Sequence, residues 1–160
     1  MALNSAQLVT LKAAIAAETD PTFAADRAAG ATGAMAAFYN GVSTFVVWKS
    51  LVTLNQIGDK INGSELAGLT TAEVQRLQTI AQYSTMGVNP SLADRRSFFD
   101  NVFSGAGGAL TRAALLALWK RFATRGEKLF ATGTGIDAAP GLLVLEGSVS
   151  NSDIVQALAS

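Results

Sequence analysis

Apolar residues recur at intervals of three and four along much of this chain, and this spacing restricts the possible folds more than any other feature. In the segment 5–18, Leu8, Leu11 and Ile15 fall on one side of an α-helix. Glycine, proline and Asn-Gly pairs interrupt the pattern repeatedly, and such residues end helices and begin turns. We therefore predict a mainly α protein, a bundle of about five or six helices with a short extended or β arm at the C-terminus.

The same spacing, with capping residues, places the other helices. We expect them at 32–40, at 55–61, at 70–84, from near 91 to about 103, from 109 or 111 to about 130, and at 153–158. The helix that ends near 130 would be the longest, with a kink or an end at Gly126, because glycine weakens a helix by about 1 kcal/mol. Residues 19–21 are expected to end the first helix, because the residue before a proline avoids helical geometry, and a short linker is expected to follow them.

Two segments have the β-branched and apolar composition of strands. Residues 44–48 predict either a short strand or the beginning of a buried helix, and residues 142–149 predict a strand. The chain of 160 residues suffices for one compact domain with an arm. We accordingly divide it into a helical domain, 1–131, and a C-terminal assembly arm of loop, strand and short helix, 132–160.

Composition excludes several function classes. The chain contains neither histidine nor cysteine, so disulfides, thiolate metal sites and His-dependent catalytic schemes are excluded. We expect no enzyme activity, no cofactor and no metal. The formal net charge is zero, whereas proteins that bind DNA freely are normally basic. No apolar run is long enough for a membrane helix, and the N-terminus lacks the pattern of a secretory signal.

The predicted C-terminal strand requires a partner, because a single strand cannot satisfy its own backbone groups. It can pair with residues 45–48, with a neighbouring subunit, or with a copy of itself. Strand addition between subunits is a recurrent assembly device, so we expect the arm to bind a partner. The predicted contact residues are Leu142, Leu143, Val144, Leu145, Val149, Ile154 and Leu158.

Basic residues are densest towards the end of the predicted long helix. Arg121, Arg125 and Lys128 fall on one face of that helix. A solvated helix face is the simpler interpretation of such a stripe. The alternative is a surface that faces DNA, for example inside a ring through which DNA passes, or that faces an acidic neighbouring subunit.

Several stretches resemble a known group of proteins. They are residues 118–135 (LWKRFATRGEKLFATGTG), 139–140 (AP), 146–150 (EGSVS), 47–50 (VWKS) and 8–15 (LVTLKAAI). Together they resemble small virion structural proteins from the morphogenesis modules of tailed bacteriophages. Size, helical content and arm are similar to the head-to-tail connector proteins that ring the portal. The resemblance implies a homo-oligomeric ring that binds the portal and other neck or tail proteins, resides in the virion and is assembled in the host cytoplasm.

Other functions remain open on the sequence. The protein could belong to the capsid or to the tail tip and baseplate, or it could be a small DNA-binding packaging factor. A fourth alternative is a virion-borne cell-wall hydrolase, which would need carboxylates such as Asp94, Asp100 and Glu146.

Overall fold

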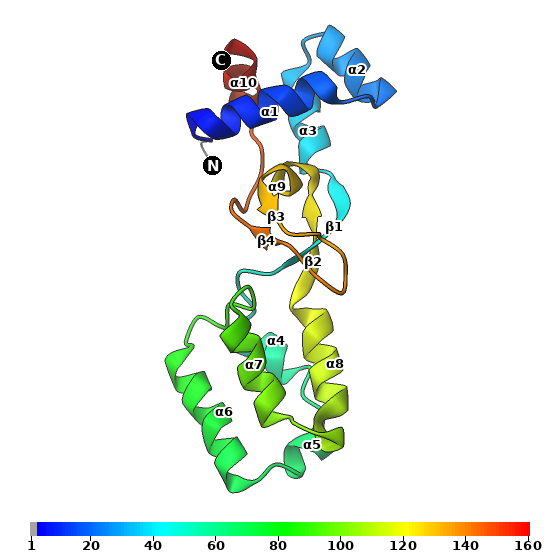
Figure 1. The fold of residues 1–160 in the computed structure, drawn as a ribbon. Coiled ribbons are helices and arrows are strands. Elements are labelled where there is room, and N and C mark those ends of the chain that lie inside the picture. Colours follow the sequence, from blue (N-terminus) through cyan, green and yellow to red (C-terminus); the bar gives the residue numbers. More distant parts are fainter. Residues whose placement is uncertain (1–2) are drawn as a thin grey trace. The chain divides into compact units, whose positions relative to one another are not determined.

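The structure, a computed structural model, describes residues 3–160 (Figure 1). The chain forms two compact units. Unit 1 combines residues up to Val47 with Phe122–Ser160, and unit 2 is Trp48–Arg121. The two ends of the chain therefore fold together, and the middle of the chain forms a unit of its own.

This division differs from the expected boundary between 131 and 132. The segment 132–160 belongs to the same unit as the first helices, because its last helix packs against two of them. Conversely, residues 48–121, expected within the helical domain, separate from its first helices and build their own core. The predicted boundary is therefore replaced by two others, after Val47 and after Arg121.

Unit 1 is built around a cluster of helices from both ends of the chain. They are α1 (Ser5–Ala17), α2 (Pro21–Ala28), α3 (Thr32–Asn40), α9 (Arg125–Phe130) and α10 (Asn151–Ala159). In Figure 1, α10 lies beside α1, and both α1 and α3 contact it. The buried side chains that they share include Leu11, Ile15, Phe23, Met35, Tyr39, Val149 and Ile154.

Local sequence explains the ends of these helices. Asn4 and Gln7 form a reciprocal cap on α1, in which each side chain accepts from the other residue's backbone N–H at 2.9 Å. Helix α2 replaces the expected linker, because Asp20 accepts from the N–H groups of Thr22 and Phe23. Pro21 is tolerated there, since it occupies the first position of the helix.

Two small sheets complete the strand region. Strands β1 (Val42–Trp48) and β2 (Lys120–Thr124) form one, and β3 (Ala131–Thr132) pairs antiparallel with β4 (Leu142–Leu143) in the other. The strand alternative for residues 44–48 is thus confirmed. The expected strand 142–149 is regular only at its first two residues.

Gly135 has φ 65°, and the ring of Phe45 occupies the place of a side chain there.

Unit 2 contains the remaining helices. They are α4 (Leu54–Gly58), α5 (Gly63–Ala67), α6 (Thr71–Tyr83), α7 (Ala93–Val102) and α8 (Ala109–Leu118), with a short 3₁₀ turn at Ala106–Gly108. Its core includes Phe99, Phe103, Leu115 and Trp119. The Glu65 carboxylate accepts from the N–H groups of Leu110 at 2.9 Å and Thr111 at 2.7 Å, which caps α8 from another part of the chain.

The predicted long helix is wrong. Residues 109–130 form α8, β2 and α9 in succession. Thr124 begins a new helix: its Oγ1 accepts from the N–H of Glu127, whose Oε2 accepts from the N–H of Thr124. The structure thus has ten α-helices among residues 3–160, more than the expected five or six, within a mainly α fold as predicted.

Candidate functional site

The structure sorts the predicted partner-binding residues into two groups. Leu142, Val144 and Leu158 are exposed, and Val144 is the most exposed at 68%. Leu143 and Leu145 are half-buried. Val149 and Ile154 are buried in the core of unit 1, so they are unavailable to a partner in this conformation. Their assignment as contact residues is corrected, because their apolar surface is already covered by the chain's own helices.

The C-terminal segment is fixed within its own unit by polar contacts as well. The Asp153 carboxylate accepts from the N–H of Ser150 at 2.8 Å and from the N–H of Leu3 at 3.2 Å. Although burial opposes ionisation of Asp153, the hydrogen bonds from Ser150 and Leu3 hold its pKa below the usual value. The charged carboxylate therefore links the start of α10 to the start of the chain.

The strand at 142–143 finds a partner that the sequence did not suggest. It pairs with β3, and the N–H of Gly141 donates to the carbonyl of Val46 at 2.8 Å. Of the three expected partners of the C-terminal strand, residues 45–48 pair with Gly141, the residue just before β4. The partner of β4 itself is β3, residues 131–132. The strand therefore has a pairing within the same chain.

Exposed large apolar side chains collect in the strand region of unit 1. We call five of them the strand-region set: Val42, Phe122, Ile136, Leu142 and Val144. Three of them lie on β1, β2 and β4, Val144 directly follows β4, and Ile136 lies between β3 and β4; their exposed fractions range from 46% to 69%. Exposed apolar groups scattered singly need no explanation, whereas several in one region indicate an interaction surface.

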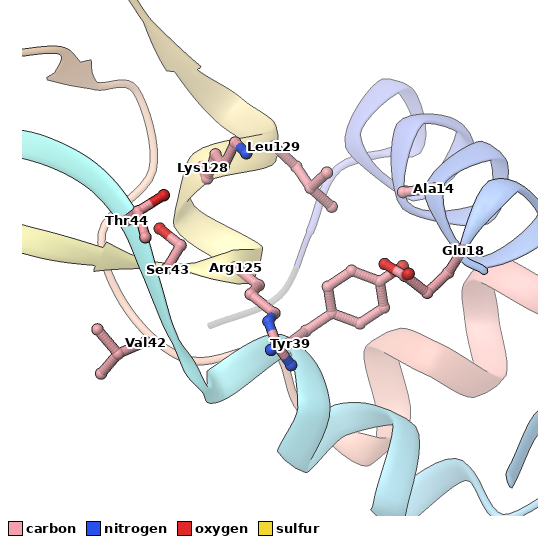
Figure 2. A pocket seen from close by; sticks show the side chains of 9 residues that line it. All are labelled: Ala14, Glu18, Tyr39, Val42, Ser43, Thr44, Arg125, Lys128 and Leu129. Carbon is pink, nitrogen blue, oxygen red and sulfur yellow. The ribbon is translucent and has the colours of Figure 1, made fainter. Parts of the chain in front are cut away.

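The three basic residues predicted on one helix face occupy two elements. Arg121 lies in β2, whereas Arg125 and Lys128 lie in α9. Arg125 and Lys128 line a cavity of about 390 Å³ in unit 1 (Figure 2). The guanidinium carbon of Arg125 lies 4.0 Å from the centre of the Phe38 ring, a cation–π contact. Arg125 and Lys128 thus share a helix, whereas Arg121 does not. The prediction that all three lie on one helix face is wrong, because β2 interrupts the predicted helix.

Tyr39 is the buried polar residue of this cavity. Its side chain points towards Glu18 in Figure 2, and its hydroxyl has no hydrogen-bond partner among residues 3–160. Burial, together with the nearby charge of Glu18, raises the pKa of Tyr39 to about 12, while Arg27 acts in the opposite direction. The phenol is therefore protonated at neutral pH, and it can donate a hydrogen bond but cannot act as a base.

The three carboxylates considered for a hydrolase are divided between the two units. Asp94 and Asp100 lie on α7 of unit 2, whereas Glu146 belongs to unit 1. In the described part of the chain, no group of three acidic side chains could hold a metal ion. No helix within residues 3–160 has the length and apolar character needed to cross a membrane.

Comparison with known proteins adds no relative. No family model, curated protein or solved structure matches the chain.

Sequence reasoning missed the cavity in unit 1. In the helix predicted at 32–40, the spacing of Phe38 and Tyr39 indicates only an apolar side. Their position beside Arg125 depends on the contact between α3 and α9, which are far apart in the sequence. The aromatic pair followed by Asn-Gly was the available signal, and it is too common to indicate a site.

Proposed function

We propose that this protein is a structural assembly subunit of a tailed-phage virion, and specifically a head-to-tail adaptor or neck-ring subunit that binds the portal. The strand-region set carries the proposal: these five apolar side chains are exposed on or between the strands of unit 1, in a chain that has no net charge. The resemblance of residues 118–135 to small virion proteins gives the biological setting.

The mechanism is geometric. Identical subunits associate side by side in a closed ring, and each strand-region set is covered by a neighbour or by the portal. Burial of apolar surface contributes about 25 cal/mol per Å² removed from water, so a few such side chains repeated around a ring stabilise it strongly. Of the residues expected in the arm, Leu142, Val144 and Leu158 remain available for these contacts.

Packaged DNA is a further contact in this proposal. Arg125 and Lys128 are exposed on α9 and present positive charge. Contacts between such side chains and phosphates are independent of base sequence and weaken as salt increases. A neutral chain needs only this local concentration of charge to line a DNA channel.

Mass measurement tests the proposal. We would determine the mass of the purified protein alone and after mixing with a portal ring. We expect a closed oligomer or a complex with the portal, and both should be lost in Val144→Asp, which adds a charge to an exposed apolar residue. Val9→Asp is the matched control, because Val9 is also exposed, at 60%, but lies on α1, outside both the strand-region set and the C-terminal arm.

A monomer that neither self-associates nor binds the portal would contradict the adaptor proposal. Truncation before residue 133 is a poor test, because Val149 and Ile154 belong to the core of unit 1 and their removal would unfold it. If rings form, charge reversal at Arg121, Arg125 and Lys128 should reduce DNA retention without loss of rings. Unchanged retention would exclude the DNA contact alone.

A further inference from the structure

Unit 2 contains a second and larger cavity, of about 590 Å³. Arg96 and Asp100 of α7 form one side of it. Ala109, Arg112, Ala113 and Leu116 of α8 form another, at positions that share one helix face. Small side chains at two of these positions leave room beside α8 that a larger residue would fill.

Both arginines at this cavity are held in place by backbone carbonyls. Arg96 donates to the carbonyl of Pro90, and its guanidinium carbon lies 3.9 Å from the centre of the Trp48 ring. Arg112 donates to the carbonyls of Phe103 and Gly105. A guanidinium has five N–H donors in a fixed plane, so these contacts orient each group and leave donors for a further acceptor.

Trp119 supplies the most direct indication of a ligand. It lines the cavity and is only 2% exposed, and its indole N–H has no hydrogen-bond partner within residues 3–160. The indole nitrogen can only donate, and neighbouring atoms cover it, so an acceptor in the cavity reaches it only when the side chains around it shift. A buried donor without an acceptor costs free energy that a suitable ligand would recover.

The charges at the cavity specify the kind of acceptor. Arg96 and Arg112 carry positive charge and Asp100 carries negative charge, which leaves one net positive charge. Burial lowers the pKa of Arg96, although Asp100 opposes this, so the charged guanidinium is partly deprived of water. A singly charged anion balances this set, whereas a doubly charged phosphate would exceed it.

We propose that this cavity binds a carboxylate group carried on a short apolar stem. The carboxylate accepts from the guanidinium groups and from the indole N–H, and the stem packs against Ala109, Ala113 and Leu116. The group can belong to a free carboxylic acid or to an acidic side chain of another polypeptide. This site is independent of the proposed assembly function, since a monomer can bind through it.

Nuclear magnetic resonance provides a direct test on the full chain. The protein has two tryptophans, so its ¹⁵N-labelled form gives two indole N–H signals, which a Trp48→Phe variant assigns. We expect butyrate to shift the Trp119 signal saturably. Butyramide, which has the same stem without the charge, should produce a much smaller shift at equal concentration and ionic strength.

Two pairs of variants locate the effect. Arg96→Gln should weaken butyrate binding by roughly tenfold, the usual contribution of one charge-assisted hydrogen bond. Arg95→Gln removes the same charge from the exposed neighbouring residue and should leave affinity unchanged. Ala113→Met should fill the cavity and abolish binding, whereas Ala117→Met, at another exposed position of α8, should not. Thermal melting checks that each variant is folded.

A second ligand distinguishes the two sources of the carboxylate, a free acid and an acidic side chain. A short peptide with one glutamate flanked by leucines is compared with its glutamine counterpart. Saturable binding of the glutamate peptide without butyrate binding would support an acidic side chain as the ligand, and binding of both would support a site for free acids as well. The proposal is overturned if neither binds, if inorganic phosphate binds more tightly than butyrate, or if Ala113→Met still binds. None of these results depends on the mass of the assembly.

Discussion

The side chain of Asn40 forms two hydrogen bonds with the backbone of Val149: Nδ2 donates to the carbonyl oxygen at 2.9 Å, and Oδ1 accepts from the N–H at 2.9 Å. Asn40 is the last residue of α3, and Val149 lies shortly before α10. The pair thus joins positions 109 residues apart in the sequence. The Asn40 side chain thus satisfies the backbone N–H and carbonyl of Val149, which a neighbouring strand would otherwise have to pair.

Replacement of Asn40 by alanine should release the C-terminal segment. The variant leaves the N–H and carbonyl of Val149 without their partner, and we expect the free energy of unfolding to fall by about 2 kcal/mol. Chemical denaturation measures this loss, and hydrogen exchange should show faster exchange in α10. Asn151→Ala is the control, because Asn151 is exposed on α10. Equal stability of the two variants would show that the Asn40 pair does not hold the segment.

Gly126 should be intolerant of alanine although it lies in a helix. A Cβ there would lie 2.7 Å from Cγ2 of Val149 and 3.3 Å from the carbonyl oxygen of Tyr39. We expect Gly126→Ala to destabilise the protein by about 1–2 kcal/mol, despite the better helix propensity of alanine. Gly33→Ala in α3 meets no neighbouring atom within 4 Å and should stabilise by about 0.5 kcal/mol. Thermal or denaturant unfolding of both variants checks the difference in sign.

The Tyr39 hydroxyl should contribute nothing to stability. Because it is buried without a partner among residues 3–160, Tyr39→Phe should leave the free energy of unfolding unchanged or raise it by about 1 kcal/mol. Tyr83→Phe is a matched control, since Tyr83 is 84% exposed and its hydroxyl contacts water. A loss of more than about 1 kcal/mol in Tyr39→Phe would mean that the hydroxyl has a partner in solution.

Asp153 should make unit 1 sensitive to acid. Its pKa in the folded chain is lower than the usual 3.8, so its stabilising contribution is complete above about pH 4 and is lost as the pH falls through the folded value. Asp153→Asn should therefore be less stable than the natural chain at pH 7, and this difference in the free energy of unfolding should shrink as the pH falls below about 4. Denaturation across this range gives the difference. A constant difference at all pH values would show that the charge of Asp153 is not involved.

Local signals in the sequence predicted many of the elements correctly. Helices α1, α6 and α10 follow from apolar spacing and from capping residues within a few positions of each helix start, whereas α3 follows from its apolar side alone. The cap of α6 is an example: Thr70 accepts from the N–H of Glu73, whose carboxylate accepts in return, as the spacing predicted. Such signals depend only on neighbouring residues, so they can be recognised in the sequence.

The break between α8 and α9 shows where this reasoning fails. Helical spacing continues through residues 119–124, and the chain is nevertheless extended there, as β2 pairs with β1 and Ala123 is fully buried. The capping residues Thr124 and Glu127 were present in the sequence as the signal for a new helix. The helical spacing of the apolar residues favoured one continuous helix over a new start at Thr124. The tertiary contacts of β2 decide against that continuous helix.

The sequence by itself determined the mainly helical composition, the capped starts of α1 and α6 and the absence of histidine and thiol chemistry, because these depend on residue types and short spacings. Only the tertiary structure decided that the two ends of the chain share one core, that Val149 and Ile154 are buried and that Arg121 lies on a strand whereas Arg125 and Lys128 lie on a helix. Each of these outcomes depends on contacts between segments distant in the sequence. Such contacts arise from the mutual fit of whole elements, which a local pattern does not encode.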